Sequence, residues 1–526
     1  MPNRILPETL RAYWRSRNEI ALLDVREEAG YAEAHPFFAV SLPLSRLELE
    51  IFARAPRKSA PLVVYDDDEG LAERAAACLA DLGYTNVAIL EGGLTGYARH
   101  GELFRDVNVP SKAFGELVEA IRHTPSLPAD EVAALIAKSA KIIVLDARRF
   151  EEYETMSIPH ALSVPGGELV RRIDDLVPSD DTTVIVNCAG RTRSILGAQS
   201  LVNAGLGNRV VALRNGTIGW MLAGHALDHG QTRRYGDATT QQGLERARAR
   251  AAAWADRVGV RAIDSALLDV WLADADSRTV YRLDVRSPKE YERAHPAGFV
   301  SAPGGQLVQA LDEWVAVRGA RLVLFDDDGV RARMAASWLV QMGWEAVIIG
   351  PGDLSQDESG VPAPPRPDRP AIGDAGITPQ ALAGDLENFA ILDLAPSPAY
   401  RKGHIPGSKF IIRSRIAEDL PKLGQGREIV LTSPDGDLAA FAVAEAAIAA
   451  AGLRVRVLLG GTTGWQTAGH ALTSDEAAWL SPTEDVYKRP YEGTDNAAEA
   501  MQAYIDWELR LVAQLANDGI CNFRVV

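Results

Sequence analysis

The chain is short of cysteine, of net positive charge and of long apolar runs. Its three cysteines, Cys78, Cys188 and Cys521, are too far apart in 526 residues to indicate a disulfide framework. No apolar stretch reaches the roughly 18 residues of a membrane-spanning helix, and the first residues lack the layout of a secretory signal. Lys and Arg number 55 against 71 Asp and Glu, a formal net charge of −16. These features predict a cytoplasmic protein with no nucleic-acid partner and no membrane partner.

What is present is typical of a globular protein. Hydrophobic residues make up 47% of the chain and charged residues 24%, and the length allows about three to five domains. An acidic protein that handles an anionic substrate must gather positive charge locally. One short segment does so.

That segment begins at Cys188, directly after the apolar run 183–187 and before the helix-like stretch 195–201. Its residues are Cys188-Ala189-Gly190-Arg191-Thr192-Arg193-Ser194. A loop between a strand and a helix directs backbone N–H groups and the positive end of the helix dipole at its contents. With two arginines nearby, we expect the Cys188 thiol to have a lowered pKa and to act as a nucleophile.

Two other interpretations of the segment are weaker. A cysteine phosphatase needs an arginine as the sixth residue after its cysteine, but that position is Ser194 and Arg193 comes one place too early. A buried structural cysteine is common among free cysteines, yet two arginines within five residues of Cys188 disfavour it. The loop resembles that of the rhodanese family of sulfurtransferases, which carry sulfur on one cysteine as a persulfide.

The same pattern of apolar strands occurs four times along the chain. A strand ending in aspartate recurs at Asp24, Asp146, Asp284 and Asp393, each followed by a second apolar strand, a polar loop, an Ala-rich stretch and a Gly-bearing turn. Apolar runs alternating with helical stretches indicate parallel strands covered by helices. The resemblance to the rhodanese family covers roughly residues 5 to 475.

The resemblance to the rhodanese family implies an α/β protein of four tandem rhodanese-like domains, each a mainly parallel sheet flanked by helices, plus a helical C-terminal tail. The expected domains are 1–108, 125–232, 258–360 and 374–475, with a helical linker at 233–257, a Pro-rich linker at 361–373 and the tail at 476–526. The tail contains an amphipathic stretch, 497–512, that we expect to dock on its own chain. A dimer contact is the alternative, so a monomer and a homodimer both remain open.

Only the second domain keeps the cysteine. Its position is taken by Asp66 in the first domain, Asp326 in the third and Ser433 in the fourth, so we expect these three domains to be inactive. The runs of three aspartates beginning at Asp66 and Asp326 suit a hard cation, but a helix cap is the favoured interpretation. We therefore predict no metal site, and the resemblance implies no cofactor.

A histidine recurs eleven residues after the repeated aspartate, at His35, His295 and His404, whereas the second domain has Ser157 there. The neighbouring His160 is a weak candidate for a base. The mechanism is therefore expected to rest on a thiolate ionised by its own loop. Of the other cysteines, Cys78 is expected in the core, and a resolving role for Cys521 is the less favoured alternative.

The resemblance implies a sulfurtransferase with one working site. Cys188 attacks the outer sulfur of a small anionic donor, thiosulfate or 3-mercaptopyruvate, while Arg191 and Arg193 hold the donor. The loop N–H groups from Ala189 through Gly190 and Thr192 to Ser194 cradle the persulfide. A thiol or cyanide then accepts the sulfur, and a protein acceptor is also open.

Some assignments keep an alternative. Arg148 is a further candidate for supporting the site, with a structural ion pair as the equal alternative. The rival function is a sulfur-relay or sensing scaffold that binds partner proteins with little turnover, and a phosphatase is a third option.

Overall fold

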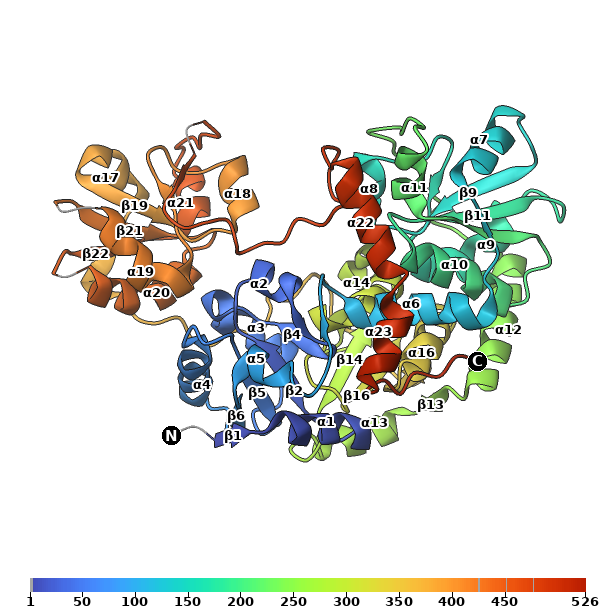
Figure 1. The fold of residues 1–526 in the computed structure, drawn as a ribbon, viewed down its shortest axis with the longest axis horizontal. Coiled ribbons are helices and arrows are strands. Elements are labelled where there is room, and N and C mark those ends of the chain that lie inside the picture. Colours follow the sequence, from blue (N-terminus) through green and yellow to red (C-terminus); the bar gives the residue numbers. More distant parts are fainter. Residues whose placement is uncertain (1–2, 424–425, 451, 476) are drawn as a thin grey trace.

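The computed structural model describes residues 3–423, 426–450, 452–475 and 477–526. Its main sheets are four, one in each repeated unit, and neighbouring strands within each sheet run parallel. The central strands are buried on both faces, as in β11, because helices cover each sheet on two sides. The predicted α/β class is confirmed (Figure 1).

The first sheet has the order β1-β6-β5-β2-β4. Its strands are β1 (Asn3–Ile5), β6 (Val87–Leu90), β5 (Leu62–Tyr65), β2 (Ala21–Asp24) and β4 (Ala39–Ser41). Its helices are α1 (Pro7–Ser16), α2 (Glu28–Glu33), α3 (Leu47–Arg54), α4 (Leu71–Asp81) and α5 (Gly93–Tyr97). An antiparallel pair, β3 (His35–Pro36) and β7 (Leu103–Phe104), lies beside them, and α6 (Val109–Arg122) leads to the second unit.

The second sheet has the equivalent order β8-β12-β11-β9-β10. Its strands are β8 (Ser126–Leu127), β12 (Val210–Leu213), β11 (Thr183–Asn187), β9 (Ile142–Asp146) and β10 (Leu162–Ser163). Its helices are α7 (Ala129–Ala137), α8 (Phe150–Thr155), α9 (Leu169–Leu176), α10 (Thr192–Asn203) and α11 (Gly216–Leu222).

The third sheet repeats this order, and the fourth repeats it with one further strand, β23, beside β20. The third contains β13 (Arg261–Ile263), β17 (Glu345–Ile349), β16 (Arg321–Phe325), β14 (Val280–Asp284) and β15 (Val300–Ser301), with α13 (Ser265–Ala273), α14 (Pro288–Arg293), α15 (Gly304–Gln309) and α16 (Arg331–Gln341). The fourth contains β18 (Gly376–Ile377), β22 (Val455–Leu458), β21 (Glu428–Thr432), β19 (Phe389–Asp393), β20 (Lys409–Phe410) and β23 (Ala478–Trp479), with α17 (Pro379–Ala383), α18 (Ser397–Lys402), α19 (Ile416–Asp419), α20 (Asp437–Ala449) and α21 (Gly461–Thr467).

Helix α12 (Gln241–Val258) begins inside the expected helical linker 233–257 and ends one residue beyond it. Thr240 caps its start by accepting a hydrogen bond from the Gly243 N–H. It packs against α9 of the second domain and α16 of the third, burying Ala247, Ala251 and Trp254. Its alanines permit this close approach, so α12 joins the two domains rather than separating them.

The C-terminal tail forms two helices, α22 (Ala498–Glu508) and α23 (Leu511–Asp518), instead of one helix over 497–512. Figure 1 shows the tail crossing from the fourth domain to the second, where α22 packs on α11 and α6, and α23 continues along α6. Arg11 of α1 donates to Asp518 at 2.8 Å, which anchors the end of α23 on the first domain. The tail thus docks on its own chain.

The aspartates in the cysteine position cap helices, as expected. Asp66 accepts hydrogen bonds from the Leu71 and Ala72 N–H groups at 2.7 and 3.1 Å. Asp326 accepts from Gly329 and Ala332 at 2.8 and 3.1 Å. These carboxylates bind the backbone where the second domain places a thiol.

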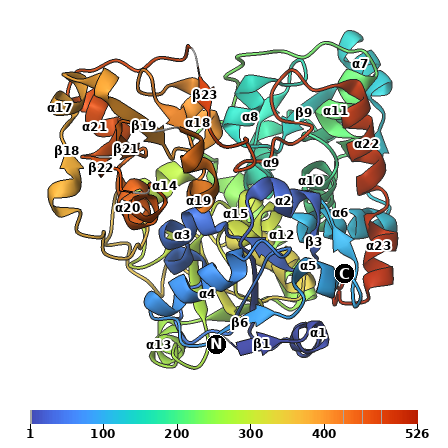
Figure 2. The same ribbon diagram turned by 60° about the vertical axis from the view of Figure 1, so that its left-hand side comes forward.

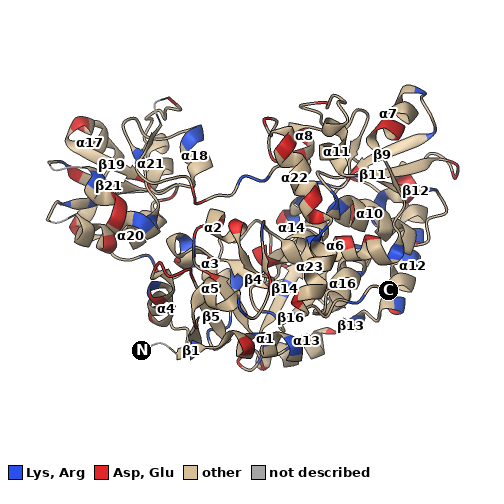
Figure 3. Ribbon diagram, viewed as in Figure 1, with Lys and Arg blue, Asp and Glu red and all other residues tan. Residues whose placement is uncertain are grey.

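Acidic and basic residues are interspersed over all four domains (Figure 3). Among the described residues, no helix has the length and apolar character to cross a membrane. The same part of the chain contains no group of three or more His, Cys, Asp or Glu arranged to hold a metal ion.

Candidate active site

Cys188 lies directly after β11, at the carboxyl end of the strand, and its loop turns into α10 at Thr192. Its side chain is 1% exposed. The Sγ donates to the Ser194 hydroxyl at 3.3 Å, and that hydroxyl donates to the Arg191 carbonyl oxygen at 2.8 Å. Parallel strand ends followed by helix starts are the usual place for a site in this fold class.

The start of α11 packs against the Cys188 loop and forms hydrogen bonds with its backbone. The Thr217 and Ile218 N–H groups donate to the carbonyl oxygens of Cys188 and Ala189 at 2.9 and 3.0 Å. Gly216, at φ +56°, touches the same stretch, and a Cβ there would lie 2.3 Å from the Cys188 carbonyl oxygen. Only glycine fits this approach, so the loop is held in one conformation.

Burial raises the pKa of Cys188, and it outweighs the lowering effects of Arg193 and of the hydrogen bonds with Ser194. The nearby Glu508 carboxylate raises the Cys188 pKa further. The expectation of a lowered pKa is therefore wrong for this closed arrangement, because the sequence does not show how completely the loop is covered.

The two loop arginines have different surroundings. Arg191 donates twice to Glu116 of α6, at 2.7 and 2.8 Å, and once to Asn215 at 3.0 Å, and it also contacts Glu119. Paired with two carboxylates, its charge is largely neutralised. Arg191 fastens the loop to α6, a helix that the sequence analysis placed in no domain.

Arg193 is the loop arginine whose charge lowers the pKa of the Cys188 thiol. It forms a two-point ion pair with Glu152 of α8, at 2.7 and 2.8 Å. Although burial favours the neutral acid, Arg193 lowers the pKa of Glu152 to about 2. The pair is therefore ionised at neutral pH, and Glu152 orients Arg193 beside Cys188.

Arg148 binds Asp146 at 2.8 and 2.9 Å and the Met156 carbonyl oxygen at 2.6 Å. The pairs Arg26–Asp24 and Arg286–Asp284 repeat this arrangement in domains that lack a cysteine in the loop position. The geometry favours the structural alternative for Arg148.

The repeated histidines are also structural. His35, His295 and His404 stack on tyrosines four residues earlier in the chain, at ring-centre distances of 4.0, 3.8 and 4.3 Å. Ser157 occupies this buried position in the second domain, and His160 is exposed. Loss of the histidine therefore removes a packing element rather than a base.

The C-terminal tail covers the loop, which the sequence did not reveal. Ala189 and Ile218 share an apolar cluster with Tyr491, Met501, Tyr504 and Ile505. A Cβ on Gly190 would lie 3.2 Å from both the Tyr504 ring and a Glu508 carboxylate oxygen. The amphipathic pattern of the tail signals that it docks, but not where.

The other cysteines lie apart from this site. Cys78 and Cys521 are partly buried in other apolar clusters, and burial raises their pKa values to about 12 and about 11.

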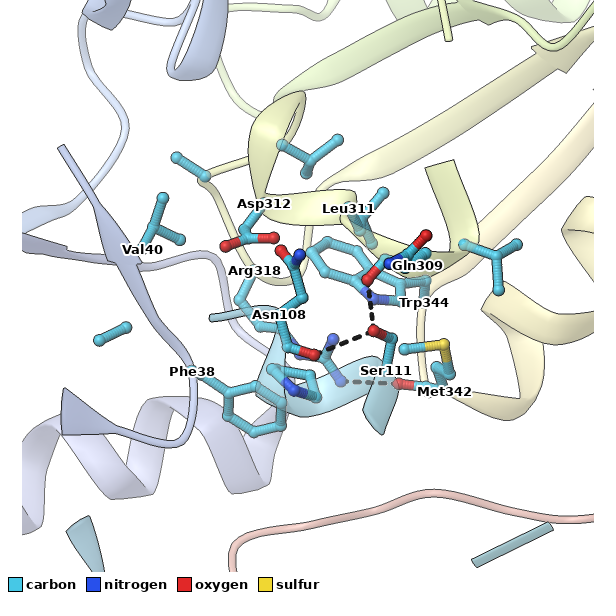
Figure 4. A pocket seen from close by; sticks show the side chains of 15 residues that line it. Phe38, Val40, Asn108, Ser111, Gln309, Leu311, Asp312, Arg318, Met342 and Trp344 are labelled. Atoms are coloured by element: carbon cyan, nitrogen blue, oxygen red, sulfur yellow. Dashed lines mark hydrogen bonds between the residues drawn. The ribbon is translucent and has the colours of Figure 1, made fainter. Parts of the chain in front are cut away.

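A cavity of about 50 Å³ between the first and third domains is lined by Arg318, Asp312 and Asn108 and by no residue of the Cys188 loop (Figure 4). There Arg318 lies over the rings of Phe38 and Trp344.

The fold and site define a class: four α/β units of one topology, of which one presents a cysteine on its strand-to-helix loop. The family model for the rhodanese-like domain matches residues 7–100, 128–223, 269–356 and 378–468, so the chain belongs to the rhodanese-like family.

The chain is similar over its full length to a solved structure, that of thiosulfate sulfurtransferase from Pseudomonas aeruginosa. The two are 54% identical with a TM-score of 0.96, and the match covers 100% of each chain. Shorter matches are to an HTH-type transcriptional regulator of Mycobacterium tuberculosis (28% identical over 100 residues) and the centrosomal protein of 41 kDa of Rattus norvegicus (34% over 80 residues). These matches cover 19% and 14% of this chain, and the chain spans only 43% and 24% of those two relatives.

Proposed function

We propose that the protein is a sulfurtransferase that moves sulfane sulfur from thiosulfate, or from a related donor such as 3-mercaptopyruvate, to a thiol or cyanide through a persulfide on Cys188. The observation that carries this is the single cysteine loop, with Arg193 beside it, in a chain 54% identical over its whole length to a thiosulfate sulfurtransferase. Asp66, Asp326 and Ser433 cannot carry sulfur.

In the first half-reaction, the Cys188 thiolate attacks the outer sulfur of thiosulfate. A new S–S bond forms at Cys188, the bond to the sulfonate sulfur breaks, and sulfite leaves with the electron pair. Arg193 stabilises the thiolate and the anionic donor, and we expect the loop N–H groups to bind the persulfide. Arg191 acts by fixing the loop through Glu116.

In the second half-reaction, the acceptor attacks the outer persulfide sulfur and Cys188 leaves as the thiolate. Cyanide yields thiocyanate, and a thiol yields a new persulfide. Because Cys188 is 1% exposed, the cover formed by α22 has to open for donor and acceptor. A cycle that needs a free thiol fits a reducing cytoplasm, which we propose as the location.

A sulfur relay between proteins is the second candidate, favoured by the near-complete burial of Cys188 under the tail. In that case a partner protein opens the cover, and small donors react slowly. We also propose the domain boundaries given above. The proposal includes two alternatives for the oligomeric state, a monomer and a homodimer.

The test is turnover of thiosulfate with saturating cyanide, followed as thiocyanate. We expect Cys188→Ser to lower turnover by at least about 10³-fold, because the nucleophile is lost. The matched control, Cys78→Ser, is expected to stay within about twofold of the wild type, since Cys78 lies in another cluster.

Turnover that survives in Cys188→Ser would contradict the proposal. A wild type that gains sulfur from thiosulfate but turns over too slowly to follow would favour the relay.

A further inference from the structure

Glu508 is a buried carboxyl group in the wall of the Cys188 site. It lies at the end of α22, is 1% exposed, and reaches the loop from outside the rhodanese-like domain. One carboxylate oxygen accepts from the Tyr504 hydroxyl at 2.9 Å and from the Thr192 hydroxyl at 3.4 Å. The other, Oε2, is buried without a hydrogen-bond partner and faces Gly190.

The cations around Glu508 are engaged elsewhere. From α6, Lys112 pairs with Asp106 at 2.8 Å and lies over the Tyr504 and Trp507 rings. From the loop, Arg191 pairs with Glu116. Within the described parts of the chain, no Lys or Arg nitrogen lies within 4.0 Å of the Glu508 carboxylate.

The result is a carboxyl group that changes charge near neutral pH. Burial, then the Glu116 carboxylate, raise the pKa of Glu508 to about 7, while Lys112, the Tyr504 hydroxyl and Arg191 oppose them. Ionised Glu508 in turn raises the pKa of Cys188. The two groups share a covered site, where charges interact more strongly than in water.

We propose that Glu508 is a positioning residue that sets the pH dependence of Cys188: its neutral acid form permits the thiolate and its anionic donor, and its carboxylate form opposes both. This inference rests on the proposed function for its donor, but the coupling of Glu508 to Cys188 does not need turnover to be seen. The C-terminal tail thereby contributes a charge to the site as well as a cover.

The test measures alkylation of Cys188 by a neutral reagent, iodoacetamide, from pH 5.5 to 9.5, without any sulfur donor. Peptide mass spectrometry separates Cys188 from Cys78 and Cys521. The variants are Glu508→Gln, which cannot ionise, and Glu508→Asp, which can. Glu499→Gln, an exposed change on the same helix, is the control.

The sign follows from the charge of Glu508. At pH 6 it is neutral in the wild type, so Glu508→Gln is expected within about twofold of the wild-type rate. At pH 8 the wild-type carboxylate suppresses the thiolate, so Glu508→Gln is expected to react about tenfold faster, equal to one unit in the pKa of Cys188. Glu508→Asp and Glu499→Gln should follow the wild-type profile.

Identical profiles for Glu508→Gln and the wild type would overturn the proposal. So would an equal acceleration at every pH, because that reports a loosened tail instead of a removed charge. If thiosulfate fails as a donor while the alkylation profile shifts as expected, the proposed donor falls and the coupling of Glu508 to Cys188 stands.

Discussion

Arg193 and Arg191 stand two residues apart and do different work. Arg193 is held by the ionised Glu152 and acts on the thiol, whereas Arg191 is neutralised by Glu116 and Glu119 and fastens the loop. From the sequence we expected both arginines to hold the donor, because the sequence shows their spacing but not the carboxylates with which they pair. We therefore propose that Arg193, rather than Arg191, binds the donor.

Arg193→Gln is therefore expected to lower kcat/KM for thiosulfate by about 10²-fold, the cost of removing one positioned donor from an anion site. The measurement is thiocyanate formation at varied thiosulfate. Arg209→Gln, an exposed change in the same domain, is the control and should match the wild type. A kcat/KM for Arg193→Gln close to that of the wild type would show that Arg193 does not act on the donor.

At the scale of elements, α22 covers the Cys188 loop, and we expect it to control access to the thiol. Its residues Tyr504 and Met501 pack on Ala189, and the loop has glycine at position 190 where a side chain would strike Tyr504. If Cys188 carries a persulfide as proposed, we expect this closure to keep it from water and other thiols, and α22 then has to move in each cycle.

Tyr504→Ala removes a buried ring from this contact, and we expect α22 to open more often. Alkylation of Cys188 at pH 7 should then rise by about tenfold or more, as for a weakened local unit. Gln502→Ala, an exposed change on the same helix, should leave the rate unchanged. An unchanged rate in Tyr504→Ala would mean that α22 does not limit access.

Local patterns predicted most of these elements and part of the site. The repeated aspartate strands, the Cys188 loop and the capping role of Asp66 and Asp326 follow from short segments, because strand burial and helix caps act over few residues. The roles of Glu116 and Glu508 do not, since they depend on α6 and α22 packing against a loop far away in the chain. The pKa of Cys188 was mispredicted for the same reason.

At the scale of the whole molecule, ion pairs join the domains that lack a cysteine in the loop position to the rest of the chain. The second domain meets the third through Arg331, which pairs with Glu168 at 2.9 Å, and the fourth meets the first through Arg413, which pairs with Glu48 at 2.6 Å. Figure 2 shows the fourth domain beside the first, and the tail helices α22 and α23 at the right-hand edge, next to α11 and α6. The first domain also anchors α23 through Arg11.

Asp66, Asp326 and Ser433 instead accept backbone hydrogen bonds at the starts of helices. We therefore propose that these three domains have a structural role and that the second domain carries the reaction. We expect a single sulfur atom per molecule, however much donor is supplied.

The most direct measurement is the intact mass of the purified full chain after incubation with thiosulfate alone, beside Cys188→Ser. We expect a gain of one sulfur atom in the wild type, on the peptide that contains Cys188, and no gain in Cys188→Ser. A gain that persists in Cys188→Ser, or no gain in a wild type whose Cys188 still reacts with iodoacetamide, would contradict sulfur transfer from thiosulfate through Cys188.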